Sequence, residues 1–158
     1  MKAETKYADR FRNGVLLRHN CSWLNLHGHV MQTIGWPDYY IAHSILGQFW
    51  IEFKVWPNTI YMKKNVKQLQ RIRELRGKGV PVIVATFFDN VEKAPEWFLK
   101  HKTIEDCTSK DFLFVMLEVY DFTKKAAILE FQKGKENESK IWDKMVELIK
   151  ILRYIQKQ

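Results

Sequence analysis

Three ionisable residues, Asp38, Glu52 and Lys54, stand where their side chains can converge. Asp38 follows Pro37, and thirteen residues separate it from Glu52. In a strand Glu52 and Lys54 point to the same face, because successive side chains alternate. Two hard carboxylates suit Mg²⁺, which lowers the pKa of bound water and neutralises charge developing on phosphorus. A nearby lysine orients or deprotonates the attacking water, or stabilises the oxyanion, so the set suits phosphodiester hydrolysis.

Two β-rich runs, 38–43 and 49–55, carry these residues. The short break between the runs predicts an antiparallel hairpin. A hairpin register brings Asp38 level with Glu52 and Lys54 at its open end, so we expect the three side chains to converge on a surface patch. Glu52 lies in a strand of large apolar residues that otherwise favours burial. A charge in that place lowers the stability of the fold, so we expect it to serve a function.

The segments around this hairpin predict a mixed fold. The run at 80–88 is almost continuously apolar, which is typical of a strand covered on both faces. Segment 65–76 would be the crossover helix before it. The residues expected on its inner stripe are Val66, Leu69, Ile72 and either Leu75 or Arg76. The further expected elements are a helix at 3–13 ended by Gly14, a loop-rich excursion at 89–111 with a short helix from Pro95, a second hairpin within 112–131 and a closing helix at 138–156.

Length and composition fit a single domain, 1–158, of the α/β (α+β) class. The 158 residues are 46% hydrophobic and can bury a sizeable core without staples. Cys21 and Cys107 are unclustered, which argues against a disulfide scaffold or a cysteine zinc site and favours a reducing, cytoplasmic location. No run approaches the roughly 20 apolar residues of a membrane span. The charged N-terminus does not resemble a secretory signal.

The chain carries excess positive charge. Its 26 lysine and arginine residues against 18 acidic residues give a formal net charge of +8. This excess favours a polyanionic partner. Seven cations lie between Lys63 and Lys78, where Glu74 is the single acidic residue. Such a basic helix is compatible either with a surface that follows phosphates or with an ordinary solvated face.

Asp38, Glu52 and Lys54, read as P-D…E-x-K, resemble the signature of the PD-(D/E)xK nuclease superfamily. The motif GWPD resembles the opening motif of the virus-type replication–repair nuclease domains and of archaeal-type junction resolvases. The run WIEFKVW resembles their central strand. Gln68 and the following LQRIRELRGKGVPVIVAT resemble their next helix and strand. The resemblance covers about residues 1–88, and it leaves 89–158 without a counterpart.

The resemblance implies a restriction-endonuclease-like core at 1–88 and an appended hairpin and helix at 89–158, which would serve as an interface or in DNA specificity. Asp38, Glu52 and the carbonyl of Phe53 would bind Mg²⁺, for which Mn²⁺ could substitute.

Three further roles are implied by the same resemblance. Lys54 would be the catalytic lysine. Gln68 would contact that lysine, a water or the DNA backbone. Glu4, on the first helix, would supply a further metal contact, for which Asp9 competes.

The predicted function is a metal-dependent DNA endonuclease, site-selective on duplex DNA, as in phage or homing enzymes. The alternatives are a Holliday-junction or branched-DNA resolvase or repair nuclease, a non-catalytic DNA-binding protein with a nuclease fold, and an RNA-processing nuclease. A duplex break needs two active sites, so we expect a homodimer or a higher symmetric oligomer that uses 112–131 and 138–156. No membrane partner is expected. The residues expected to contact DNA are Lys63, Lys64, Lys67, Arg71 and, by stacking on a base, Trp36.

Overall fold

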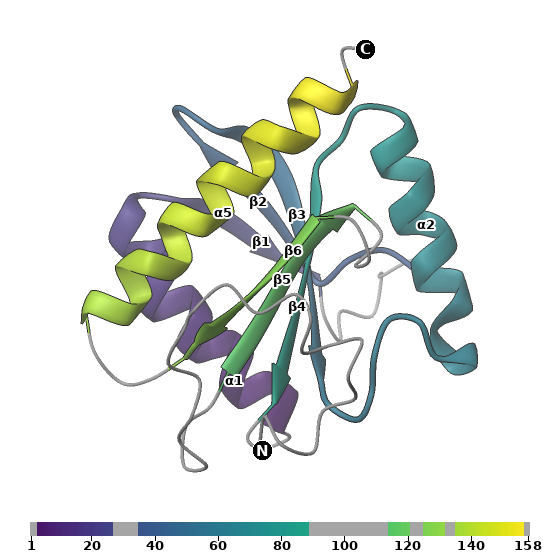
Figure 1. Cartoon of the computed structure of the whole chain (residues 1–158), viewed down its shortest axis with the longest axis horizontal. Helices are drawn as coiled ribbons and strands as arrows, with labels where there is room; N and C mark the ends of the chain where they lie inside the picture. The colour runs from purple at the N-terminus through teal and green to yellow at the C-terminus, as the bar shows by residue number, and fades with distance from the viewer. Residues whose placement is uncertain (1–2, 27–34, 89–113, 121–124, 132–134, 157–158) are drawn as a thin grey trace.

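Six strands form one mixed sheet with α-helices on both faces, which is an α+β arrangement (Figure 1). The computed structural model describes residues 3–26, 35–88, 114–120, 125–131 and 135–156. The strands lie side by side in chain order: β1 (Ser22–Asn25), β2 (Tyr39–His43), β3 (Gly47–Val55), β4 (Val82–Phe88), β5 (Phe114–Tyr120) and β6 (Lys125–Glu130). The α-helices in these ranges are α1 (Ala3–Phe11), α2 (Val66–Gly77) and α5 (Lys135–Gln156).

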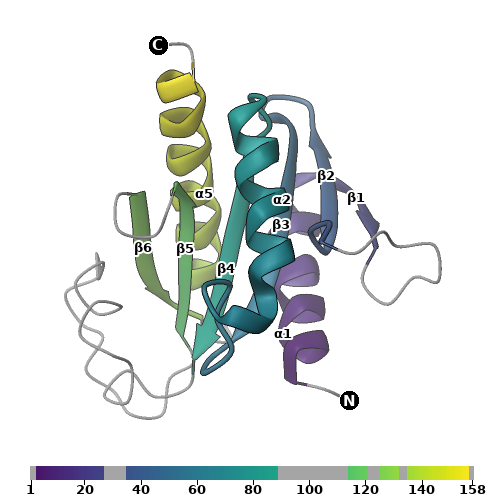
Figure 2. The same cartoon turned by 90° about the vertical axis from the view of Figure 1, so that its right-hand side faces the viewer.

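Side-chain alternation along β3 divides its residues between two cores. Ile51 and Phe53 pack in the larger core with α1 and α5. Trp50 points the other way and packs against the smaller core beneath α2. Figure 2 shows α2 on the near side of the sheet, with α1 and α5 on the far side. Glu52 and Lys54 alternate in step with Trp50 and therefore belong to the α2 face.

The first predicted hairpin is confirmed. Strands β2 and β3 pair antiparallel, from Tyr39 opposite Ile51 to His43 opposite Gly47. Gly47 has a φ of +74°, a left-handed conformation that side chains other than glycine rarely adopt, and this permits the tight return of the chain. The pairing leaves Asp38 immediately beyond the last paired residue of β2.

The crossover helix is also confirmed, since α2 connects β3 to β4 and these two strands pair in parallel. The expected inner stripe was wrong at Val66, which is 48% exposed. Val66 is the first residue of α2, directly after the 3-10 turn η3 (Lys63–Asn65), and it lies outside the contact with the sheet. Ile72 is buried as expected, and Arg76 completes the buried side of the helix.

The first helix does not end at Gly14 as expected. The chain continues from α1 into a π-helical segment, η1 (Arg12–Leu16), and a 3-10 turn, η2 (Leu17–His19). Val15 and Leu16 are fully buried in the larger core, so tertiary packing keeps the chain helical past the glycine. The segment ends at Asn20, which adopts the left-handed conformation common at helix C-termini.

The second hairpin and the closing helix are both present. Strands β5 and β6 pair antiparallel, and β5 also pairs antiparallel with β4, so the hairpin extends the same sheet. Helix α5 begins at Lys135, three residues before the expected start, and its apolar stripe packs into the larger core. The expected short helix at Pro95 lies outside the described residues. Within the described ranges, no helix is long and apolar enough to cross a membrane.

Because β4 is buried, removing one methylene group from it should lower the stability of the protein measurably. Ile83 is fully buried, so Ile83→Val should lower the free energy of unfolding by about 0.5–1.5 kcal/mol. The matched control is Ile45→Val, because Ile45 is 81% exposed and the change should stay within about 0.5 kcal/mol. Urea unfolding of both variants provides the measurement. Equal effects at the two positions would contradict the assignment of Ile83 to the core.

Candidate active site

Asp38 and Glu52 hold each other in place at the open end of the β2–β3 hairpin. The backbone N–H of Asp38 donates to Glu52 Oε2 at 3.1 Å. The backbone N–H of Phe53 donates to Asp38 Oδ2 at 2.9 Å. Each carboxylate thus accepts a bond from the other segment, just beyond the last ladder pair between β2 and β3. Both carboxylates are therefore oriented by backbone groups.

Lys54 completes the cluster on the α2 face, as its spacing predicted. Its Nζ forms an ion pair with Glu52 Oε1 at 3.0 Å. The expected surface patch was wrong, because Asp38, Glu52 and Lys54 are only 3%, 1% and 4% exposed. The reason is the place of β3 inside the sheet, where β2 and β4 flank it and both of its faces are covered.

The cluster would carry more negative than positive charge if both of its carboxyl groups were ionised. Burial, with the neighbouring charge of Asp38 as the second cause, raises the pKa of Glu52 to about 8. Lys54 acts in the opposite direction, and Glu4 adds a smaller increase. Two carboxylates share one ammonium group in a site shielded from water. A further cation would therefore be bound favourably there.

A small cavity of about 20 Å³ adjoins Asp38 on the side of α1. Its volume is enough for one water molecule or ion. Glu4 and Asp9 of α1 both line it together with Asp38 and Phe53, so the structure places both candidates for the extra acidic contact at the same cavity. Glu4 and Asp9 therefore remain alternatives.

The donor atoms in the cluster fit Mg²⁺. Glu52 Oε1 is buried, and its contact within the described part of the chain is the ion pair with Lys54. Mg²⁺ commonly uses only one or two protein carboxylates and completes its shell with water and substrate phosphate. In the ranges that the structure describes, no group of three or more histidine, cysteine, aspartate or glutamate side chains is arranged to hold a metal. A site here would thus depend on the Asp38–Glu52 pair.

Helix α2 supplies the next predicted residues. Gln68 is half-buried, and its Oε1 is buried with no hydrogen-bond partner among the described residues. Lys63, Lys64 and Lys67 are exposed and unconstrained by burial, as phosphate contacts require.

Trp36 and Arg71, both expected to contact DNA, contact each other. The Arg71 guanidinium lies 4.7 Å from the centre of the Trp36 ring and 3.4 Å from Glu74. Gly35 brings the backbone close to α2, since a Cβ at this position would lie 3.0 Å from the carbonyl oxygen of Lys67. The GWPD segment is therefore docked on the helix. At least one face of Trp36 is already covered by the arginine.

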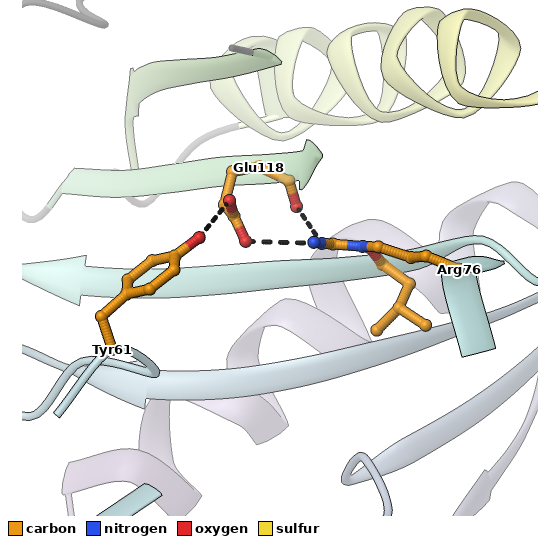
Figure 3. Close-up of polar contacts among 4 residues, drawn as sticks. Tyr61, Arg76 and Glu118 are labelled. Carbon is orange, nitrogen blue, oxygen red and sulfur yellow. Dashed lines mark hydrogen bonds and ion pairs between the residues drawn. The ribbon is translucent and has the colours of Figure 1, made fainter. Parts of the chain in front are cut away.

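Sequence reasoning missed a buried polar network on the same face of the sheet. Glu118 of β5 contacts Tyr61, from the β3–α2 connection, and Arg76 of α2 (Figure 3). One signal for it was available, because Glu118 interrupts an apolar strand just as Glu52 does. The partners were not predictable, because they lie 57 and 42 residues away in the chain.

Comparisons of the chain with protein-family models, with curated proteins and with solved structures found no match.

Proposed function

We propose that the protein is a Mg²⁺-dependent DNA endonuclease with a restriction-endonuclease-like core of the PD-(D/E)xK type. The observation that carries this proposal is the buried pair of carboxylates, Asp38 and Glu52, beside the single ammonium of Lys54. The order of helix, hairpin, crossover helix and parallel strand supports it. A purely structural role explains the cluster poorly, because burying two carboxyl groups beside a single ammonium costs stability.

In the proposed mechanism each residue has a distinct task. Asp38 and Glu52 would hold Mg²⁺, which when bound would lower the pKa of a water and offset charge on the phosphate. Lys54 places an N–H donor beside the carboxylates, where it orients the attacking water or stabilises the oxyanion. The unpaired Oε1 of Gln68 can accept a hydrogen bond from that water or from Lys54. Burial excludes bulk water and strengthens these interactions.

Site-selective cleavage of duplex DNA by a symmetric oligomer is part of the proposal, since one chain carries one such cluster among its described residues. The apolar stripe of α5 packs into its own core. An interface that involves this helix would therefore use its solvent-facing side.

Cleavage assays test the proposed function directly. Wild-type protein would be incubated with Mg²⁺ or with EDTA on supercoiled plasmid, a phage genome and a synthetic four-way junction. Discrete fragments that need Mg²⁺ are the expected result. Symmetric nicks in the junction with intact plasmid would indicate a resolvase instead. Salt-sensitive binding without metal-dependent cutting of any substrate would favour a non-catalytic DNA-binding protein and contradict the proposal.

The role of the exposed lysines predicts a change in salt dependence. The double variant Lys63→Ala/Lys64→Ala should bind duplex DNA more weakly and lower the slope of log K against log salt by about 2, or roughly 0.9 for each phosphate that is no longer neutralised. Fluorescence anisotropy at several salt concentrations measures this slope. The matched control is Lys140→Ala/Lys150→Ala, which removes the same charge from exposed positions of α5. Equal changes in both variants would show that net charge alone attracts DNA.

A further inference from the structure

Glu118 is a buried carboxylate outside the Asp38–Glu52–Lys54 cluster. It is 1% exposed and lies on β5, opposite Val84, which in turn lies opposite Glu52. Residues in one such row point to the same face of a sheet. Glu118 and Glu52 therefore share the α2 face, separated by one intervening strand and roughly 10 Å. At that separation Glu118 does not contact the proposed site.

The two carboxylate oxygens of Glu118 contact residues at opposite ends of α2. The hydroxyl of Tyr61 donates to Oε2 at 2.8 Å, and Tyr61 lies shortly before the helix. Arg76, in the last turn of α2, places its guanidinium 3.4 Å from Oε1. Figure 3 shows Tyr61 and Arg76 approaching Glu118 from opposite sides. The side chain of Glu118 thus connects the segment before α2 and the last turn of α2 to strand β5.

Arg76 also anchors the end of α2 to the backbone. It donates to the carbonyl of Val82 at 2.7 and 3.1 Å, and to the carbonyl of Glu118 at 3.4 Å. The carbonyl groups belong to β4, which pairs with β3, and to β5, which pairs with β4. The C-terminal end of the helix is therefore attached to the same sheet that carries Glu52.

We propose that Glu118 is a positioning residue that sets the place of α2 on the sheet. Between Tyr61 and Arg76 the chain carries Lys63, Lys64 and Gln68, which the proposed function assigns to DNA and water. Glu118 then determines how these groups lie relative to Glu52 and Lys54. Well-packed apolar residues often stabilise a fold as well as a buried ionic network does, so the network is better explained by the position it defines. The functional part of this proposal rests on the proposed nuclease activity.

Two variants test the proposal. Tyr61→Phe removes one hydroxyl and leaves the Arg76–Glu118 pair intact. The triple variant Tyr61→Phe/Arg76→Met/Glu118→Leu replaces the network with apolar groups and leaves no unpaired buried charge. The control is Ile149→Val, which lowers stability in the other core, beneath α5. Comparison with this control separates a change of position from a general loss of stability.

The first readout is amide hydrogen exchange without DNA. We expect exchange to rise selectively at residues 61–77 in both network variants, whereas Ile149→Val should leave these amides unchanged relative to the rest of the chain. A uniform rise, or no rise at 61–77 in the triple variant, would overturn the proposal. This readout needs no nuclease activity, so it decides whether Glu118 holds α2 in place even if the wild type fails to cut DNA.

The second readout is steady-state cleavage. Both network variants should show a KM for DNA raised several-fold, a lowered kcat because Gln68 is displaced together with the lysines, and a salt slope lowered by about 1. Ile149→Val should keep the wild-type KM. Wild-type KM and salt slope in the triple variant would overturn the functional part of the positioning role, even where hydrogen exchange had risen at 61–77. A wild-type protein that cuts no substrate would count against the proposed function alone.

Discussion

The Asp38→Asn protein is expected to lose Mg²⁺-dependent cleavage by roughly 10²–10³-fold, the cost typical of removing one group that stabilises transition-state charge. Asparagine keeps a carbonyl oxygen that can accept the N–H of Phe53, so the local hydrogen bond can persist. What the variant loses is one of two negative charges available to a divalent cation. The loss should therefore appear in activity without loss of the fold.

The same substitution should make the protein more stable above pH 8. Asp38 is the second cause of the raised pKa of Glu52, after burial, so its removal lowers that pKa toward the ordinary value. Each unit of decrease corresponds to about 1.4 kcal/mol of stability at a pH above both values. Loss of activity combined with a gain in stability distinguishes a functional carboxylate from a structural one.

Parallel cleavage assays and thermal unfolding provide the measurement. Glu147→Gln is the matched control, because Glu147 is a half-exposed glutamate of α5 with an ion-pair partner, Lys144, on its own helix. It should cut DNA as the wild type does. An Asp38→Asn protein with wild-type activity would contradict the proposed site or expose a contaminating nuclease. An inactive variant that had also unfolded would contradict the expected gain in stability.

The hairpin and the residues clustered at its open end were largely predictable because local patterns determine them. Alternation places Glu52 and Lys54 on one face, while Phe53 faces the core, and the continuous apolar run of β4 requires cover on both sides. These patterns specify which face a residue occupies. They do not specify what lies above that face. The burial of the cluster was therefore missed.

Other features depend on contacts between distant residues. Gly14 predicts a helix end, but the burial of Val15 and Leu16 against the larger core overrides the local preference. In the sequence Arg76 is one more cation of a basic helix, and only the fold brings it to Glu118, 42 residues away. Composition and periodicity contain no information about that partner. The Glu118 network could be predicted only as an unexplained charge in an apolar strand.

The stability of the metal-free protein should fall as pH rises from about 5 to 8. The ordinary pKa of a glutamate is 4.5, and in the folded protein the pKa of Glu52 is raised to about 8. Between these values the folded state holds a proton that the unfolded state has released. Raising the pH therefore favours unfolding, up to a limit of about 5 kcal/mol set by the difference in pKa.

The variant Glu52→Gln isolates this contribution, because glutamine retains an oxygen to accept the N–H of Asp38 but does not ionise. Other groups also titrate in this range. Burial lowers the pKa of His19, so its contribution has the opposite sign and is lost as pH falls below 6.5. The free energy of unfolding of the wild type should fall steadily from pH 5 to 8 relative to that of Glu52→Gln. Urea unfolding at fixed ionic strength in EDTA measures it.

A divalent metal should oppose this loss of stability, because the stabilisation that it provides should grow as the pH rises. A cation that binds the folded state competes with the proton on Glu52, and at a concentration about 100 times its Kd it adds about 2.7 kcal/mol of stability. Mg²⁺ should therefore stabilise the wild type more at pH 8 than at pH 5. The gain should be much smaller in Glu52→Gln, which lacks one of the two carboxylates. An equal gain in both proteins, or a gain independent of pH, would place the metal away from Glu52. A pH-dependent gain confined to the wild type would connect the cost of burying the two carboxylates to the cation that they bind.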